Sequence, residues 1–495
     1  MKSMCQSIKA VVLAVLFIVT FTSNAQEVTT PRVDQRMELL SIVFRLAEVS
    51  EFSEPNNLPY LAKVEKWFAP YKEHSVVQYT KFLKETQGIE KGMAHSAIPD
   101  LAIRLNIKKG KVSLNKDLSF DDLDDRWVPD SLPKYIKLLN DFYKKSKFET
   151  FFNSNTQYYR GVEERFKTQV SDKIDFQWFN DFFGDNDFSF ESNMIISLLT
   201  GSNNYGASAY SKDGKKHIYS VNGFGYTDSL DLPMFSPQFH NVVVHEFCHS
   251  FCNPIIDKYL DQLYPQAEKF YKSYEYKMKM QSYGSVEHYL SEIFVRACTM
   301  HYMSRQAEDR EERLDIIFED MQLEKYYGFL WIDSLYNILE YYQHNRRIYK
   351  NIDSFMPEIV NLQNRLNPEE IYQTFESRRA TILGTNIENG DQDVDYNLDS
   401  IVVYFDIPMA VYNSGASYDM ECKECKKWNS SSKKNYWSKD AKSWIFFIGL
   451  EPDSEYSMIF PDIFFMTSHK NPEGYWEIYR PKNTYRLRFK TRKKQ

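Results

Sequence analysis

The stretch His245-Glu246-Phe247-Cys248-His249 places two imidazoles four positions apart, with a carboxylate directly after the first. On an α-helix, side chains at positions i and i+4 lie on one face about 6 Å apart, so both rings can bind one metal ion. A chain with only ten histidines seldom contains this pattern by chance. The stretch therefore predicts a metal-holding helix, and the fold around it has to bring a further ligand to the same face.

The residues on either side indicate where this helix begins and ends. Ser236-Pro237 is typical of a helix start, with serine as the N-cap and proline in the first turn. The apolar run Val242 to Val244 leads into the motif, as expected for a buried helix. Asn253-Pro254 predicts its end, because proline lacks the N–H that continues a helix.

The residues before the helix are rich in β-forming side chains. Strands are expected within Asn193 to Thr200 and within Tyr210 to Phe224, and Lys212-Asp213-Gly214 is expected to form a hairpin turn. A strand over Gly206 to Tyr210 is either a sheet edge to which an extended peptide adds or an ordinary strand.

A catalytic zinc needs a third protein ligand and one open position. Ser285 to Arg305 is expected to form an amphipathic helix, and it contains Glu292 between apolar neighbours. A carboxylate on a buried face is costly unless it is paired or binds a metal, which favours Glu292 as the third ligand. The alternative is a surface salt bridge between Glu292 and Arg296, four positions later.

Two imidazoles with an adjacent glutamate form the H-E-x-x-H pattern of zinc peptidases. In such a site the two rings hold Zn²⁺, and the glutamate accepts a proton from water. The pattern therefore predicts His245 and His249 as ligands and Glu246 as the general base.

The motif followed by a glutamate on a later helix resembles the gluzincin class of zinc metallopeptidases. The longer stretches HEFCHSFCNP and EIFVRA resemble a secreted bacterial family known as a domain of unknown function, and so do RMELLSIVFRLAE and FQWFNDFFG. This likeness covers residues from about 30 to 380. It implies a zincin-like fold, with His245, His249 and Glu292 as zinc ligands and Glu246 as the base.

One position departs from the thermolysin-like pattern, in which an aspartate four residues after the ligand glutamate supports a zinc-binding histidine. Here that residue is Arg296, so the partner of the imidazoles has to come from elsewhere. Such a site also needs a donor for the tetrahedral oxyanion. The candidates near Glu292 in sequence are Tyr283, His288, Tyr289 and Arg296. His288 is alternatively a solvated or core histidine.

The N-terminus predicts export. Lys2 and Lys9 precede the apolar run Ala10 to Phe21, and Ser23-Asn24-Ala25 has the small residues that a signal peptidase reads, so residues 1–25 are expected to be removed. The run is too short to span a membrane, and no later stretch approaches 18 apolar residues. The remaining chain has a net charge of −9, which excludes a basic nucleic-acid footprint. A periplasmic or secreted protein is expected.

Five cysteines remain after this cleavage, an odd number. Cys248, Cys252 and Cys298 are expected to be small buried residues, with a thiolate ligand as the alternative. Cys422 and Cys425 form a lone C-x-x-C, for which a local disulfide is expected because a second pair for a zinc site is missing.

The length predicts more than one folding unit, in an α+β chain. We expect a helical N-terminal part over residues 26–174, a zincin-like domain over 175–385, a linker at Asn386 to Asn397, and an all-β domain over 395–495. The stretch from Leu450 to Tyr456 resembles the tyrosine corner of immunoglobulin-like sandwiches, although a small β-barrel fits the same strands. The aromatic stretch Phe176 to Phe183 indicates core packing or a ligand platform.

Three functions fit these observations. The first is an exported zinc metallopeptidase that acts on a peptide or protein substrate. The second is a zinc amidohydrolase that cleaves a cell-wall or sugar-linked amide. The metal site alone does not distinguish these functions, since the metal interacts with the carbonyl group and not with the groups on either side of it. The third is a binding protein that keeps the motif without turnover, with the Ig-like module as its contact surface. The intact Glu246 argues against the third.

Overall fold

The computed structural model describes residues 27–53, 59–86, 93, 95–184, 190–470 and 474–494. Runs of helices and runs of strands follow one another along the chain, so the protein is α+β as expected. The expected signal peptide, residues 1–25, lies outside the described residues. Within them, no helix combines the length and the apolar character needed to cross a membrane.

Helices dominate the N-terminal part, as the apolar periodicity predicts. The first, α1 (Gln35–Leu46), is capped by Asp34, whose carboxylate accepts a hydrogen bond from the Arg36 N–H, and it buries the stripe that includes Met37 and Phe44. The other helical elements of this part are α2 (Ser50–Ser53), α3 (Pro59–Phe68), η1 (Ala69–Tyr71), α4 (Ser75–Thr86), α5 (Ala97–Ile103), α6 (Leu132–Lys145), α7 (Phe148–Ser154), α8 (Thr156–Gln169), η2 (Ser171–Lys173) and α9 (Gln177–Phe183). The hairpin β3 (Leu105–Lys108) and β4 (Lys111–Leu114) lies among them.

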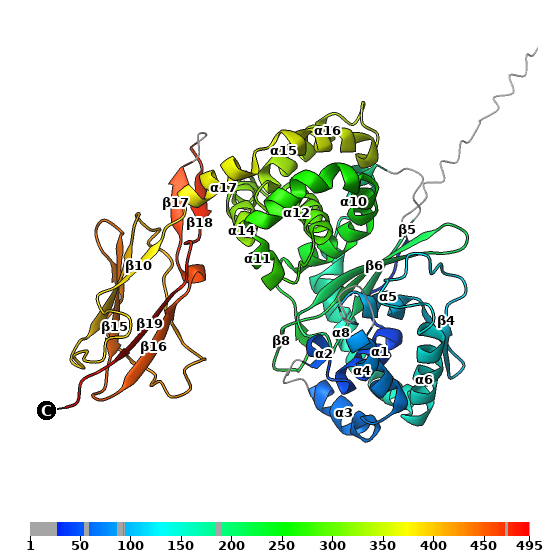
Figure 1. Cartoon of the computed structure of the whole chain (residues 1–495). Coiled ribbons are helices and arrows are strands. Elements are labelled where there is room, and N and C mark those ends of the chain that lie inside the picture. Colours follow the sequence, from blue (N-terminus) through cyan, green and yellow to red (C-terminus); the bar gives the residue numbers. More distant parts are fainter. Residues whose placement is uncertain are drawn as a thin grey trace, which may run out of the picture.

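One mixed sheet lies between these helices and the HEFCH helix (Figure 1). Its strands follow the order β1 (Glu27–Val28), β5 (Phe190–Ile196), β7 (Lys216–Asn222) and β6 (Asn204–Tyr210), and β2 (Arg32–Val33) also pairs with β5. β6 runs antiparallel to β7 and forms the sheet edge, and Gly214 takes a positive φ of 88° in the turn between them. The predicted turn is therefore confirmed, and the strand over Gly206 to Tyr210 is an edge strand.

The HEFCH helix, α10 (Phe239–Ser273), begins later and ends much later than the sequence predicts. Its N-cap is Gln238, so Ser236 and Pro237 precede the helix. The expected end at Asn253-Pro254 is wrong, because the helix continues through Pro254. Proline at this position frees the carbonyl of Ser250, and the buried ammonium of Lys216 from β7 donates a hydrogen bond to that carbonyl.

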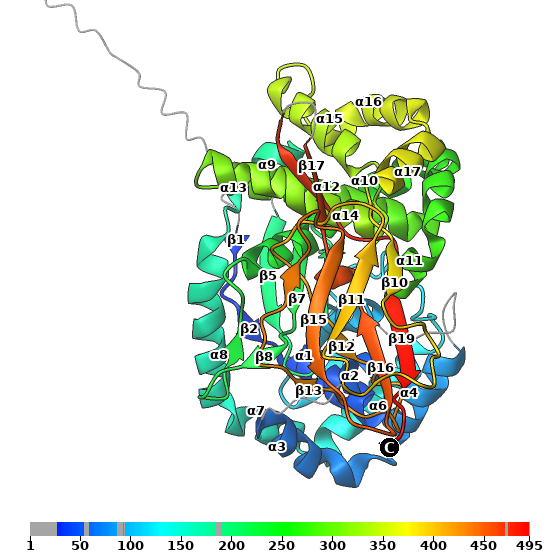
Figure 2. The same ribbon diagram turned by 90° about the vertical axis from the view of Figure 1, so that its left-hand side faces the viewer.

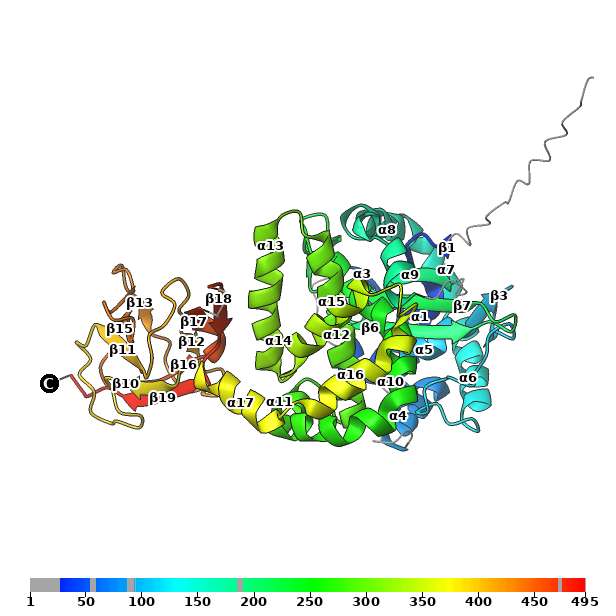
Figure 3. The same cartoon turned by 90° about the horizontal axis from the view of Figure 1, so that it is seen from above.

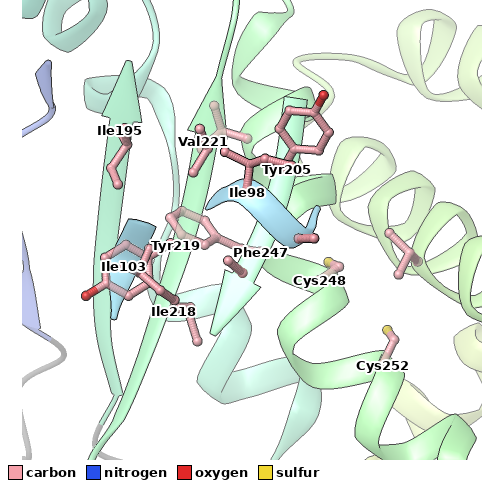
Figure 4. Close-up of a cluster of buried hydrophobic side chains, with 14 of the residues drawn as sticks. Ile98, Ile103, Ile195, Tyr205, Ile218, Tyr219, Val221, Phe247, Cys248 and Cys252 are labelled. Atoms are coloured by element: carbon pink, nitrogen blue, oxygen red, sulfur yellow. The ribbon is translucent and has the colours of Figure 1, made fainter. Parts of the chain in front are cut away.

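The helix packs against β6 and β7 of the sheet. Figure 4 shows part of the buried hydrophobic cluster that includes Phe247 and Cys248 of α10 and Ile218 of β7. The aromatic stretch before β5 also belongs to this core, since Phe183 stacks on Phe251 of α10 with ring centroids 4.5 Å apart. Core packing is therefore the role of that stretch.

Further helices complete the first core, and two short strands, β8 (Tyr226–Thr227) and β9 (Pro233–Met234), pair before α10. The second helix of the candidate site, α12 (Val286–Gln306), matches its predicted range to within one residue and packs along α10. The others are α11 (Glu275–Met280), α13 (Arg310–Asp315), η3 (Ile316–Asp320), α14 (Met321–Tyr327), α15 (Ile332–His344), α16 (Ile352–Arg365) and α17 (Pro368–Ser377).

The C-terminal part is built from strands, as expected of an all-β region (Figure 2). One sheet contains β10 (Ile382–Thr385), β11 (Ser400–Phe405), β15 (Ser443–Gly449), β13 (Asn429–Ser430) and β14 (Tyr436–Trp437). The other contains β12 (Ser417–Tyr418), β16 (Glu455–Phe460) and β19 (Tyr485–Lys490), and β17 (Thr467–Lys470) pairs with β18 (Trp476–Tyr479), while η4 (Asp462–Phe464) joins β16 to β17. Side chains from both sheets share a second core. Cys422 and Cys425 form the expected disulfide.

The second core begins at Ala380, before the expected linker. Residues 386–397 are part of the β-structure: the N–H of Gly390 donates to the carbonyl of Arg488, and Val394 bridges to Thr491. The boundary therefore lies between Ser377 and Ala380. The polar side chains of residues 386–397 lead to the prediction of a linker, because the pairing of these residues involves their backbone and leaves no signal in the side chains.

The two parts touch where α17 leads into β10 (Figure 3). The buried guanidinium of Arg379 donates hydrogen bonds to the carbonyls of Arg480 and Pro481 and to the hydroxyl of Tyr274. Tyr479 of the C-terminal part packs into the first core, beside Phe375. A second contact joins the Tyr326 hydroxyl to Asp462 at 2.6 Å.

Two truncated chains test this boundary. A chain that ends at Ser377 should fold and keep the candidate metal ligands, with a lower urea midpoint because the contacts of Arg379 and Tyr479 are lost. A chain that ends at Gly390 should aggregate, because it keeps β10 without the strands that cover it. Circular dichroism and size-exclusion chromatography measure both. If the shorter chain is unfolded, the two parts fold as one unit.

Candidate metal centre

The two imidazoles of the motif face the same side of α10. Their ring centroids lie 5.0 Å apart. Both rings are mostly buried, with 20% of the His245 side chain and 17% of the His249 side chain exposed. The local helix therefore produces the pairing that the four-residue spacing predicts.

Glu292 of α12 completes a triad with them. Its Oε1 lies 3.4 Å from Nε2 of His249, and its Oε2 lies 3.7 Å from Nε2 of His245. One ligand atom from each of the three residues falls within 4.8 Å of the others, so the three can hold a metal ion. The Ser285 side chain caps α12 by accepting the His288 N–H, which fixes the start of the helix two turns before Glu292.

Arg296 contacts the same carboxylate, so the salt bridge that competed with the ligand role is also present. Its Nε lies 3.3 Å from Oε2 of Glu292, and its Nη1 lies 2.6 Å from Oε2 of Glu324 in α14. Its guanidinium carbon lies 4.6 Å from the ring centroid of Phe329. Glu292 is thus held between the imidazoles and a buried cation.

The structure supplies a partner for one imidazole that the sequence did not reveal. Oδ1 of Asn253 lies 3.3 Å from Nδ1 of His249, the ring nitrogen that faces away from Glu292. Such a contact orients a metal-binding ring. Asn253 follows His249 by four positions, so the helical spacing could have identified it, but the predicted helix end at Asn253-Pro254 excluded it.

The charges of the triad depend on one another. Burial lowers the pKa of His245 to about 3. Burial also opposes a charged His249, but the hydrogen bond and charge of Glu292 outweigh it and raise the pKa of His249 to about 9. Burial likewise opposes a charged Glu292, yet His249, His245 and Arg296 hold its pKa well below the usual value. A metal ion would therefore meet an ionised carboxylate and a neutral His245.

Glu246 is buried beside the triad and next to the edge strand. Burial raises the pKa of Glu246 to about 7, while the charge of His249 and the backbone N–H of Gly206 oppose this rise. β6 comes this close because residue 206 is a glycine: a Cβ there would lie 2.4 Å from the carbonyl oxygen of Glu246. Sequence reasoning placed Gly206 in a strand but missed this role.

The four candidate oxyanion donors occupy different surroundings. Arg296 and Tyr283 lie beside Glu292, and Nη2 of Arg296 donates to the Tyr283 hydroxyl at 3.1 Å. Burial and the charge of Glu292 raise the pKa of Tyr283 to about 12, so this hydroxyl keeps its proton. Tyr289 is fully buried and stacks on Phe329 with ring centroids 5.7 Å apart. The His288 side chain is exposed, and within the described residues no hydrogen bond or ion pair joins it to the triad.

A cleft with a volume of about 440 Å³ opens beside His249. β6 forms one wall with Gly206, Ala207 and Ser208, and the continuation of α10 past the motif forms another. The carboxylates of Asp100, Asp122 and Asp124 line the far side. The buried guanidinium of Arg104 pairs with the first two of these.

Comparison with protein families identifies the larger part of the chain. A family described as a domain of unknown function (DUF4932) matches residues 29–362, and the chain belongs to that family. The match ends ahead of the C-terminal β-structure. The comparison with curated proteins gives no match.

Among solved structures, the matches are to the bacterial S-layer protein SbsC. They are its N-terminal part (9% identity, 54% of this chain and 60% of that chain, TM-score 0.16) and a structure of its domains 1-6 (12% identity, 55% and 35%, TM-score 0.15). The chain spans 60% or less of the length of these structures. At such TM-scores they carry no argument about fold or function.

Replacing Glu292 tests the triad. Glu292→Ala should lower zinc affinity by roughly a hundredfold, because it removes one of three ligands, while Arg296 keeps its ion pair with Glu324. Glu287→Ala on the exposed start of α12 is the matched control and should bind zinc like the unchanged protein. Competition with a chromophoric chelator measures both. Equal affinities in the two variants would remove Glu292 from the ligand set.

Proposed function

We propose that this protein is an exported zinc-dependent metallopeptidase of the gluzincin type. The observation that carries the proposal is the convergence of His245, His249 and Glu292, with ligand atoms within 4.8 Å of one another, beside the buried carboxylate of Glu246. Two imidazoles and one carboxylate are a ligand set that suits zinc, and they leave a coordination position open. The zincin-like fold of this region is part of the proposal.

The three ligands would hold the ion, which when bound supplies a Lewis acid that polarises the substrate carbonyl and lowers the pKa of water. Glu246 takes up the proton of the attacking water and passes it to the leaving amine. Its pKa of about 7 suits both steps, because a carboxylate near neutrality can accept and release a proton at similar cost. Asn253 keeps His249 in its ligating orientation.

Tyr283 is the donor that we assign to the developing oxyanion. Its oxygen accepts a hydrogen bond from Nη2 of Arg296, and its own proton, which lies within hydrogen-bond reach of Glu292, would turn to the oxyanion when the substrate is bound. Arg296 is engaged with Glu292 and Glu324, and therefore serves to position Tyr283 and the ligand carboxylate. We do not assign this role to Tyr289, which is buried in the core, or to His288, whose side chain is exposed.

An extended peptide substrate would add to the edge of β6, in front of Glu246. The carbonyls of Ser208 and Tyr210 on this edge already accept hydrogen bonds from Arg104 and from the N–H of Ser119. The substrate backbone would therefore pair with the strand over residues 204–207.

The C-terminal part is proposed to be an Ig-like module that contacts a surface or a protein partner. The N–H of Glu451 donates to the hydroxyl of the buried Tyr456 at 2.8 Å, which is the local contact expected of a tyrosine corner. Export through residues 1–25 places the enzyme in the periplasm or outside the cell.

Glu246→Gln is the central test. Glutamine keeps the shape of the side chain and loses the proton acceptor, so hydrolysis of a mixed peptide library should fall by about 10² to 10⁴ while zinc content stays the same. The control is Glu287→Gln, an exposed residue of α12. Equal cleavage by both variants would contradict a peptidase site. Activity of the unchanged protein on cell-wall or sugar-linked amides alone would favour an amidohydrolase, and zinc binding without any turnover would favour a binding protein.

Tyr283→Phe tests the assigned donor. Loss of one hydroxyl should lower kcat by about 10² to 10³ with little change in KM or zinc content, because the hydrogen bond forms mainly in the transition state. Tyr289→Phe is the matched control, since its ring lies in the core, and it should keep the original kcat. A Tyr283→Phe variant with unchanged kcat would remove this residue from the mechanism.

A further inference from the structure

Two buried cysteines meet between the helices of the candidate metal centre. Sγ of Cys252 in α10 lies 3.8 Å from Sγ of Cys298 in α12, although the residues are 46 positions apart in sequence. Their residues are 3% and 1% exposed. Neither belongs to the metal triad, and both are free thiols in this structure.

The surroundings of this pair favour a covalent bond over a ligand role. The two sulfurs are in van der Waals contact, and they need to approach by less than 2 Å to reach bonding distance. The third buried cysteine, Cys248, lies one turn before Cys252 on the same helix. A short hydrophobic contact between two cysteines is the ordinary alternative in a reducing environment.

We propose that Cys252 and Cys298 form a disulfide that links α10 to α12 in the exported protein. The bond forms by thiol–disulfide exchange: the thiolate of one cysteine attacks a disulfide-containing oxidant, such as oxidised glutathione, and releases one glutathione thiolate. The second cysteine thiolate then attacks the protein sulfur of the mixed disulfide and releases the other glutathione thiolate. The two cysteines lose two electrons and two protons, and the oxidant leaves as two thiols. Cys248 remains reduced.

The bond has to form while the chain folds. In the folded protein the pair is shielded from solvent, and burial raises the pKa of Cys298 well above its usual value, so little reactive thiolate is present. The two helices must be close for the second exchange step. The bond can therefore form only when α10 packs correctly against α12.

The disulfide would hold together α10 and α12, the two helices that carry the candidate metal ligands. Cys252 lies one turn after His249, and Cys298 lies less than two turns after Glu292. The segment that the bond closes contains α11 and Tyr283. This consequence rests on the proposed metal centre, and the oxidising surroundings rest on the proposed export, whereas the existence of the bond does not depend on metal or activity.

The test is a map of the cysteines in the full-length protein after export, and after refolding with reduced and oxidised glutathione. The protein is denatured, its free thiols are blocked with N-ethylmaleimide, and its peptides are analysed without reduction. Blocked Cys248 and a linked Cys252–Cys298 peptide pair are expected. Blocked Cys248, Cys252 and Cys298 in both preparations, or a link that contains Cys248, would overturn the proposal.

Thermal unfolding gives a second readout with a matched pair of variants. Cys298→Ala and Cys248→Ala each remove one buried sulfur, but only the first removes the bond. Without reductant, Cys298→Ala should unfold roughly 5 °C or more below Cys248→Ala, and a reductant should close this gap. A gap that persists in reductant would assign the loss to packing and contradict the bond.

Discussion

The ionised carboxylate of Glu292, buried between two helices, is the constraint on which the candidate centre depends. A charge in such a place is tolerated only with partners, and this one has two imidazoles on one side and a guanidinium on the other. Each partner contacts a different part of the molecule: the imidazoles belong to α10, whereas Arg296 reaches Glu324 in α14. The packing of three helices is thus linked to one side chain.

In this arrangement Glu292 can form a salt bridge with Arg296 and also face the two imidazoles as a candidate metal ligand. The arginine keeps the carboxylate ionised and in place, while the imidazoles meet the oxygens from the other side. The salt bridge and the candidate metal ligands are therefore parts of one network. The same guanidinium donates a hydrogen bond to the hydroxyl of Tyr283, so one cation contacts both the candidate ligand and the proposed donor.

The sequence predicts best what depends on neighbouring residues. Helical spacing predicts the His245–His249 pair, and apolar flanks identify Glu292 as half-buried. The sequence also predicts an all-β C-terminal part. Contacts between distant segments cannot be predicted in this way: Glu324 is 28 positions from Arg296, and Lys216 is 34 positions from Ser250.

The sequence does not show that Lys216 binds the carbonyl freed by Pro254, so Asn253-Pro254 is interpreted as a helix end. This error also concealed Asn253 as the partner of His249. The linker expected at residues 386–397 has the same explanation, since these residues pair with a strand almost a hundred positions later.

The hydrogen bond from Lys216 to the carbonyl of Ser250 has a consequence for how the sheet is aligned on the helix. Successive side chains of a strand point to opposite faces, so a shift of β7 by one residue would turn the ammonium away from α10. The carbonyl that Pro254 leaves without an N–H would then be buried without a donor, and a positive charge would face the opposite side of the sheet. Apolar side chains alone tolerate several alignments, but this polar pair tolerates one. Pro254, which interrupts the hydrogen bonding of α10, thereby selects the register in which the edge strand lies against Glu246.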